Sequence, residues 1–159
     1  EIKQLDPVIK INVNQFEKDE DKLRYIKNIL SEIKEKESII KYDKNINVEK
    51  IGEYKFISLC AENYPIKNFK SFIDEQKKLN QKSVIILTSS SDKKVSIIIG
   101  VTKDATDKIN AKSLVIVASN VLGGNGGGGR VDLAQAGGND KTKIHKMLEI
   151  LKKEILNVI

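Results

Sequence analysis

The chain has 159 residues, of which 40% are hydrophobic and 31% charged, a balance typical of folded proteins rather than disordered ones. It contains no run of about 18 apolar residues, which excludes a membrane-spanning helix, and we expect no membrane partner. The formal net charge is +6, with residues 1–42 neutral and residues 43–159 holding the whole excess. A basic domain favours a polyanionic partner such as nucleic acid, although an AT-rich genome would also enrich lysine.

The first part of the chain, residues 1–42, is predicted to be a helical stalk or linker. Asn14 and Glu17 have the spacing of a helix cap, and we expect one helix over residues 14–40. The apolar residues of this helix recur in alternating steps of three and four, as in a coiled coil. They are Phe16, Leu23, Ile26, Leu30, Ile33 and Ile40. The segment is therefore a candidate for homodimerisation, and packing on its own chain fits the pattern equally. Because the start, EIKQLDPVIK, has neither an initiating Met nor an apolar signal core, we expect a piece of a longer or processed protein.

The second part, residues 43–159, is predicted to form an α/β domain with a mixed β-sheet covered by helices. Strands are expected over residues 53–61, 82–89, 94–102 and 130–136, and helices over 66–80, 107–123 and from 144 onward. Asp107 is the expected cap of the middle helix, and Gly123 its end. The single cysteine, Cys60, is expected to be a buried thiol in a reducing cytoplasm. No His, Cys and carboxylate residues have metal-site spacing. The lysine pairs 77–78, 93–94 and 152–153 are interpreted as solvated faces.

Eight of the ten glycines lie in residues 121–138, VLGGNGGGGRVDLAQAGG. Flexible linkers usually mix glycine with Ser or Thr, so we favour a loop whose backbone N–H groups approach a phosphate or sugar. The pattern matches neither a P-loop nor a dinucleotide-binding turn. Arg130 adds a planar charged donor suited to a phosphate or a guanine edge, and Gln135 can contact a base or hold the loop. The candidate nucleic-acid-binding residues are Lys112, Gly123, Gly124, Gly126, Gly127, Gly128, Gly129, Arg130, Asp132, Gln135, Gly137 and Gly138.

The stretch GGNGGGGRVDLAQAGG resembles the signature of the C-terminal, DHHA1-type domain of alanyl-tRNA synthetases. That signature is a glycine-rich loop, Arg-Pro-Asp, a hydrophobic residue and Ala-Gln-Ala-Gly-Gly. The preceding IIIGVTKDATDKINAKSLV, the helical stalk and the closing helix are also similar, so the resemblance covers nearly the whole chain. This chain departs from the signature by one additional glycine before Arg130 and by Val131 in place of the proline.

The resemblance implies a non-catalytic domain without a cofactor of its own, which contacts the outer corner of alanine-specific tRNA in the cytoplasm. Other domains of the parent synthetase would carry out aminoacylation and editing with ATP, Mg and Zn, and the stalk would mediate dimerisation. Two alternatives remain. The domain also occurs in DHH-family nucleotide phosphoesterases, where it grips the substrate, but their loop usually reads Gly-Gly-Gly-His. Otherwise the chain is a purely structural dimerisation module whose glycines only shape the fold.

Overall fold

The computed structural model describes residues 19–43 and 45–159, and the chain divides into two units, 1–38 and 39–159. The first unit contains most of helix α1 (Asp19–Asp43), whose first turn carries three acidic residues that favour a helix start. The helix continues three residues beyond its expected end, while the expected cap at Asn14 lies outside the described residues. Two leucines of the predicted seam, Leu23 and Leu30, are 57% and 50% exposed.

The second unit is a mixed six-stranded sheet, which confirms the predicted fold class. The strand order is β1-β2-β3-β4-β6-β5, with β2 and β3 parallel and every other neighbouring pair antiparallel. The strands are β1 (Asn47–Ile51), β2 (Tyr54–Glu62), β3 (Ser83–Ser90), β4 (Val95–Val101), β5 (Gly127–Gly129) and β6 (Leu133–Gly138). The helices are α2 (Phe69–Leu79), α3 (Ala111–Val121) and α4 (Ile144–Leu156). None of the described helices is both long and apolar enough to cross a membrane.

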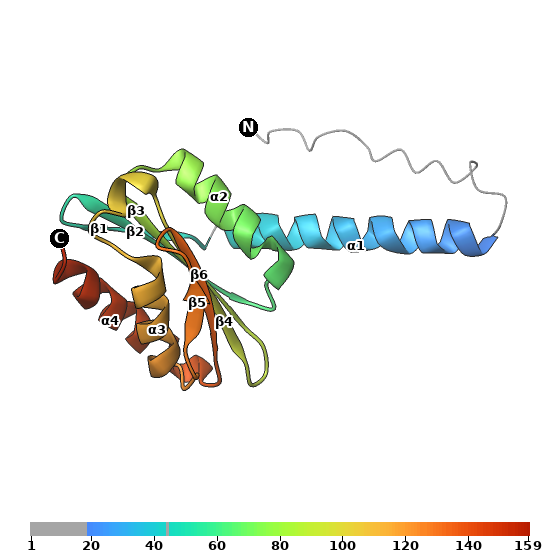
Figure 1. Ribbon diagram of the computed structural model, residues 1–159. Coiled ribbons are helices and arrows are strands. Elements are labelled where there is room, and N and C mark those ends of the chain that lie inside the picture. Colours follow the sequence, from blue (N-terminus) through green and yellow to red (C-terminus); the bar gives the residue numbers. More distant parts are fainter. Residues whose placement is uncertain (1–18, 44) are drawn as a thin grey trace. The chain divides into compact units, whose positions relative to one another are not determined.

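Helices cover both faces of the sheet, with α2 on one face and α3 and α4 on the other (Figure 1). Successive side chains of a strand point to opposite faces, so the central strands feed two separate cores. On β4, Ile97 and Ile99 pack toward α3 and α4, while Ile98 packs toward α2. All eight residues of β3 are buried, which explains why its sequence is one continuous run without alternation.

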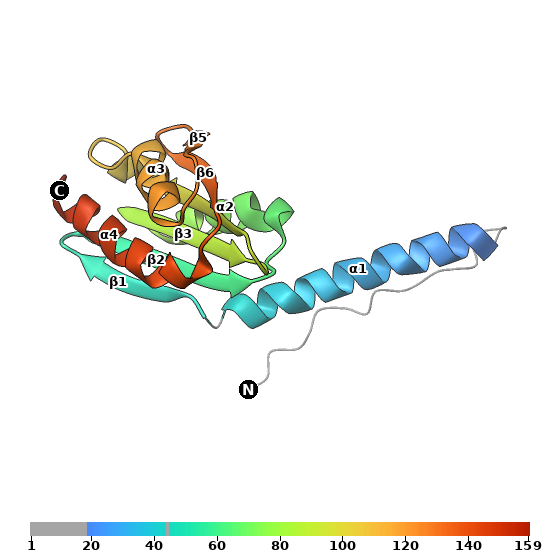
Figure 2. The same ribbon diagram turned by 90° about the horizontal axis from the view of Figure 1, so that it is seen from below.

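Helix α4 lies beside strand β1 (Figure 2), and an ion-pair network joins the two elements. Lys152 Nζ lies 2.8 Å from a carboxylate oxygen of Glu49 and 2.9 Å from one of Glu149. The same ammonium lies 5.5 Å from the ring centroid of Phe56, within the range of a cation–π contact. Its side chain is only 19% exposed. The interpretation of pair 152–153 as a solvated face is therefore wrong for Lys152.

Three local predictions are corrected. Strand β1 was not expected, because its sequence NVEKI is mostly polar and pairs at the sheet edge, with Val48 56% exposed. Helix α3 begins at Ala111 rather than near Asp107, because the Asn110 side chain accepts bonds from the backbone N–H groups of Lys112 and Ser113. Cys60 is exposed rather than buried, since it lies on β2 beyond the core residues of its face.

One glycine outside the cluster sets the spacing between α2 and the sheet. A Cβ built on Gly100 of β4 would lie 2.2 Å from Ile73 Cγ2 of α2. Ile73 is fully buried, so its side chain has no free space into which to move. The glycine therefore lets the helix pack directly on the strand backbone.

We predict that Gly100→Ala lowers the free energy of unfolding by about 1–3 kcal/mol, because a new methyl group overpacks this contact. Urea unfolding followed by circular dichroism measures the change. The matched control is Gly128→Ala, where an added Cβ meets no atom within 4 Å and stability should not fall. Equal stabilities for the two variants would contradict the packing role of Gly100.

Candidate functional site

The glycine-rich segment forms half of a hairpin rather than a loop. Gly127, Gly128 and Gly129 make strand β5, which pairs antiparallel with Ala136, Gln135 and Ala134 of β6 at the edge of the sheet. Arg130 N–H donates to Leu133 O at 2.8 Å and closes the hairpin. The expected strand over residues 130–136 is therefore corrected, because its first three residues form the turn that we call the hairpin tip, Arg130–Asp132.

Four of the glycines are required by close packing. An added Cβ would lie 2.0 Å from Gly137 O at Gly124 and 2.5 Å from Ala136 Cβ at Gly127. At Gly129 it would lie 2.4 Å from Leu133 O, and at Gly138 it would lie 2.4 Å from Leu122 Cβ. Real Cβ atoms do not approach other atoms this closely, so these positions exclude every larger residue.

Two further glycines are required by backbone conformation. Gly123 has a φ of 73° and ends α3 in the left-handed region, as the sequence predicted. Gly126 has a φ of 105°, where a side chain is strained even though space is open around it. Gly128 and Gly137 meet neither condition, since their φ is not in the left-handed region and an added Cβ would meet no close atom.

A buried serine that the sequence analysis missed joins helix α3 to strand β6 and to the residue that precedes β5. Ser119 Oγ accepts a hydrogen bond from Gly126 N–H at 3.1 Å and donates to Gly137 O at 2.8 Å. Ser119 is fully buried, so these bonds replace contacts with water. A serine on the apolar face of a helix, directly before the glycines, was the available signal.

Three charged side chains interact at the hairpin tip, with Asp132 between Arg130 and Lys77. Arg130 Nε donates to Asp132 Oδ1 at 3.0 Å, and the Arg130 side chain is 74% exposed. Lys77 of α2 donates to Asp132 O at 2.7 Å and lies 3.4 Å from Asp132 Oδ2. The Arg130 hydrogen bond, together with the charge of Lys77, holds the pKa of Asp132 below its usual range. Lys77 is only 19% exposed, so its interpretation as part of a solvated face is wrong.

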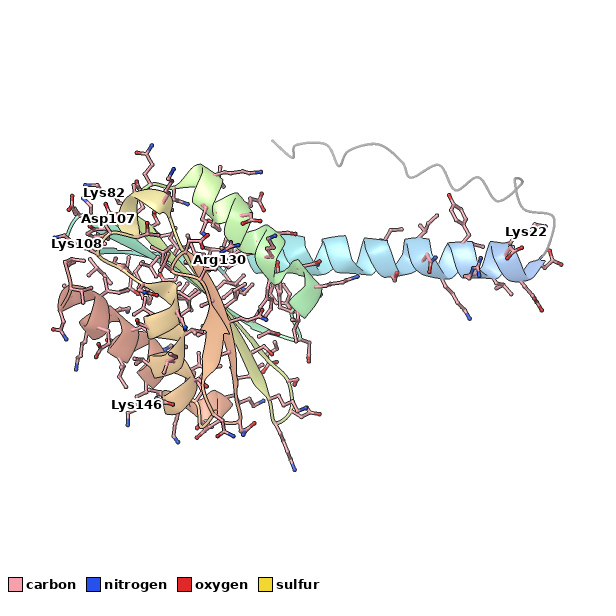
Figure 3. The ribbon with its side chains drawn as sticks, viewed as in Figure 1. Lys22, Lys82, Asp107, Lys108, Arg130 and Lys146 are labelled. Atoms are coloured by element: carbon pink, nitrogen blue, oxygen red, sulfur yellow. The ribbon has the colours of Figure 1, made fainter. Side chains whose placement is uncertain are left out.

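A basic cavity of ≈ 570 Å³ opens beside the hairpin tip. It lies between α2 and the turn after β4, and Figure 3 shows Arg130 on the side of the sheet that faces α2. Three lysines, two hydroxyl groups and two carboxylates line it: Lys77, Lys78, Lys103, Thr102, Thr106, Asp74 and Asp132. An anion is the ligand class that this charge distribution favours.

The predicted site residues do not form one pocket. Four glycines gather at the far end of the hairpin, where a cavity of ≈ 330 Å³ is also lined by Lys94 and Asn139. Arg130 and Asp132 lie at the tip, roughly 20 Å away along the six residues of β6. Gln135 is exposed between the two ends, on the face of α2. Lys112 is exposed at the start of α3, which Ala111 N–H joins to Val131 O at the tip.

The described residues contain no group of three or more His, Cys, Asp or Glu side chains that could hold a metal ion. Cys60 is the one thiol of the sequence; although its side chain is exposed at the surface, the surrounding protein atoms desolvate it and raise its pKa, which disfavours the reactive thiolate.

Comparison with known proteins gives one matching family and a set of related sequences. Residues 52–157 match the DHHA1 domain family. The chain is 42% identical over 107 residues to the alanine–tRNA ligase of Bradyrhizobium diazoefficiens and 43% identical over 110 residues to that of Rhodopseudomonas palustris. These matches cover 67% and 69% of this chain but only 12% of each ligase.

Solved structures give the same result at the level of the fold. The C-Ala domain of Aquifex aeolicus alanyl-tRNA synthetase matches with a TM-score of 0.65 and 33% identity, over 69% of this chain and 97% of that one. A DHH-domain protein described as a member of the s1p family of ribosomal proteins matches with a TM-score of 0.58 and 15% identity, over 84% of this chain and 33% of that one. The second likeness concerns the fold alone.

The charges at the hairpin tip predict a pH-dependent contribution to stability. Because the pKa of Asp132 is lowered on folding, its ion pairs stabilise fully above the ordinary Asp pKa of about 3.9 and lose effect as pH falls through the lowered value. Asp132→Asn should cost less than about 1 kcal/mol at pH 7, since the carboxylate is partly exposed and screened. Urea unfolding of both proteins at pH 7 and pH 3 measures the difference, which should shrink at the lower pH. A difference that is the same at both pH values would contradict the charge role.

Proposed function

The chain belongs to the DHHA1 domain family, and on that basis we propose that it serves as the C-terminal, tRNA-binding domain of an alanine–tRNA ligase. It spans 12% of the length of the ligases that it matches, so activation of alanine with ATP, transfer to tRNA and editing fall to other domains. Any Mg²⁺ or Zn²⁺ that those reactions use would belong to those domains. The contribution of this chain is to hold alanine-specific tRNA.

The observation that carries this proposal is the exposed guanidinium at the hairpin tip. Arg130 uses its Nε to donate to Asp132, which fixes the orientation of the planar group. A guanidinium has five N–H donors, so several remain directed at solvent and are available to a phosphate. Lys78 and Lys103 line the neighbouring cavity and add positive charge for the same backbone. Because the group is already oriented, little side-chain entropy is lost when RNA binds.

The phosphoesterase alternative has weaker support. Its structural likeness to a DHH-domain protein is at 15% identity, whereas the relatives at 42% and 43% identity are alanine–tRNA ligases. Arg130, rather than a histidine, follows the glycines. The signature residues therefore favour the synthetase role.

A second role, dimerisation through α1, is favoured by the two leucines of its seam. Leu23 and Leu30 are one heptad apart and are exposed, as the residues of a coiled-coil interface are before pairing. We propose that a second copy of this chain covers them. Ile29, which is not a residue of the predicted seam, is buried, at 7% exposure.

For RNA binding, we predict that Arg130→Ala weakens tRNA affinity by about 1–3 kcal/mol and lowers the slope of log affinity against log salt by about one. Fluorescence anisotropy with labelled alanine-specific tRNA at several salt concentrations measures both quantities. The matched control is Lys146→Ala on α4, which lies on the opposite face of the sheet (Figure 3). Unchanged affinity combined with a lower melting temperature would instead favour the purely structural role.

For dimerisation, we predict that Leu23→Lys combined with Leu30→Lys converts a dimer into a monomer in sedimentation equilibrium. Two charges in each half of the seam would repel across the interface and lose the apolar contact. Circular dichroism should show that the helical content of the globular unit is retained. A wild-type protein that sediments as a monomer at all concentrations would refute this role and leave the tRNA-binding proposal intact.

A further inference from the structure

Gly128 is a glycine for which the fold gives no reason. Its φ lies outside the left-handed region, and a Cβ built on it meets no atom within 4 Å. Glycine within a strand costs roughly 0.5–1 kcal/mol relative to alanine, because it loses more conformational freedom on folding. Its neighbours Gly127 and Gly129 are explained by clashes with β6, but this position is not. A residue that lowers stability without a packing benefit points to something that approaches the surface closely at this point.

The missing side chain opens a groove on the face of α2. Gly128 and Gln135 are paired across β5 and β6, and both point away from α3. The groove has a volume of ≈ 420 Å³ and runs between this pair and the start of α2, where it is walled by Ile66, Phe69 and Lys70. A cavity of ≈ 370 Å³ continues it along Gln135 toward Ser96. The groove is separate from the cavity beside the hairpin tip, with which it shares no lining residue.

The walls of the groove combine three kinds of contact. Ile66 is 62% exposed, which is unusual for a large apolar side chain, so its apolar surface is available for contact. Gln135 is exposed, and among the described residues its amide makes no hydrogen bond. Lys70 is exposed at the mouth of the groove. These groups offer an apolar surface for a flat ring, a paired donor and acceptor for the ring's edge, and a cation for an attached phosphate.

We propose that this groove binds one exposed nucleobase of an RNA, with the glycine at 128 making room for the ring. The apolar face of the base lies against Ile66 and the bare backbone of β5. The Gln135 amide bonds to the edge of the base, as Gln does with adenine, and Lys70 meets the phosphate of the same nucleotide. The inference rests on the proposed function, because the bound strand is taken to be the tRNA whose backbone Arg130 contacts.

Charge supports a nucleotide rather than an apolar peptide as the occupant. Lys70 stands at the groove, and Lys77 and Arg130 follow on the same face toward the hairpin tip. A phosphodiester strand following this face would meet cations at both ends and one amide between them. A peptide helix would instead need a continuous apolar stripe, and the exposed apolar contribution here is Ile66 alone.

The test is to fill the groove with a side chain at position 128. Gly128→Leu places a branched side chain in the open space, and Gly128→Ala fills less of it. Affinity for an alanine-specific tRNA transcript should fall about tenfold or more for the leucine variant, the loss expected when one base contact is removed. The alanine variant should show a smaller loss. Both melting temperatures should stay level or rise, because the glycine is replaced where its flexibility is not needed.

Two further measurements separate base recognition from other causes. The salt slope of the leucine variant should match that of wild type, since the substitution removes the base contact but leaves Lys70 and its phosphate contact in place. A tRNA carrying 2-aminopurine at exposed positions of its corner loops should change fluorescence on binding wild type, and should not change with Gly128→Leu. Gln135→Ala should reproduce the affinity loss in part, whereas Lys146→Ala on the opposite face should not.

The outcomes distinguish this inference from the proposal on which it rests. If tRNA binds with the predicted dependence on Arg130 but Gly128→Leu binds equally well, the groove holds no base and this inference is overturned alone. If wild type does not bind tRNA, both fall. If the leucine variant unfolds, Gly128→Ala and Gln135→Ala decide the question, and wild-type affinity in both would overturn the inference.

Discussion

Close packing of the β5–β6 hairpin against α3 is the constraint on which the proposed binding surface depends. Gly127 and Gly129 have no room for a Cβ because β6 and, at Gly127, α3 fill that space. Ser119 of α3 holds the same region by hydrogen bonds to backbone atoms of Gly126 and Gly137. The hairpin is therefore held by contacts on the face that packs against α3. Its other face makes no contact with α3. Gly128 and Gln135 lie on that second face, and Arg130 lies at the hairpin tip.

The two faces divide the roles that the glycine cluster combines in the sequence. Residues at 124, 127, 129 and 138 let strands and a helix approach one another, and this role belongs to the fold. Gly128 faces away from α3, and the fold does not require it. A cluster that looks uniform in sequence thus contains a set that the fold requires and two glycines that it does not, Gly137 and the proposed recognition residue Gly128. Substitutions within the cluster should accordingly differ in effect, with stability lost at the required set and RNA affinity lost at Gly128.

Much of the fold was predictable because local sequence patterns indicate its elements. The apolar runs of β3 and β4, Pro65 before α2 and Gly123 after α3 are each local signals, and the structure has the corresponding elements. Strand β1 was missed because an edge strand needs little apolar alternation, and β5 because three glycines carry no strand propensity at all. Both strands exist because a neighbouring strand offers its hydrogen bonds, which is tertiary information.

The site was harder to predict for the same reason. The sequence analysis named Arg130, Asp132 and Gln135 as candidates beside the glycines and expected one strand over residues 130–136, whereas strand pairing spreads the candidate residues along a hairpin with Arg130 and Asp132 at its tip. Lys77 lies 55 positions from Asp132 in the chain, and nothing in its local sequence distinguishes it from solvated lysines. Ser119 likewise acquires its role only when the helix meets the strands. Contacts between distant segments are what the local patterns lacked.

The shortness of β5 has a consequence for the behaviour of the protein in solution. A sheet edge exposes unpaired backbone groups that can recruit another strand and begin aggregation, and most proteins guard such edges with charged side chains. Strand β5 has three residues and no side chains with which to do so. Its protection is geometric, because the positive φ of Gly126 at one end and the charged turn at the other leave too short a ladder for a second strand to join. A bare edge is thus tolerated because it is short, and we expect that an insertion which lengthened it would promote strand addition and aggregation.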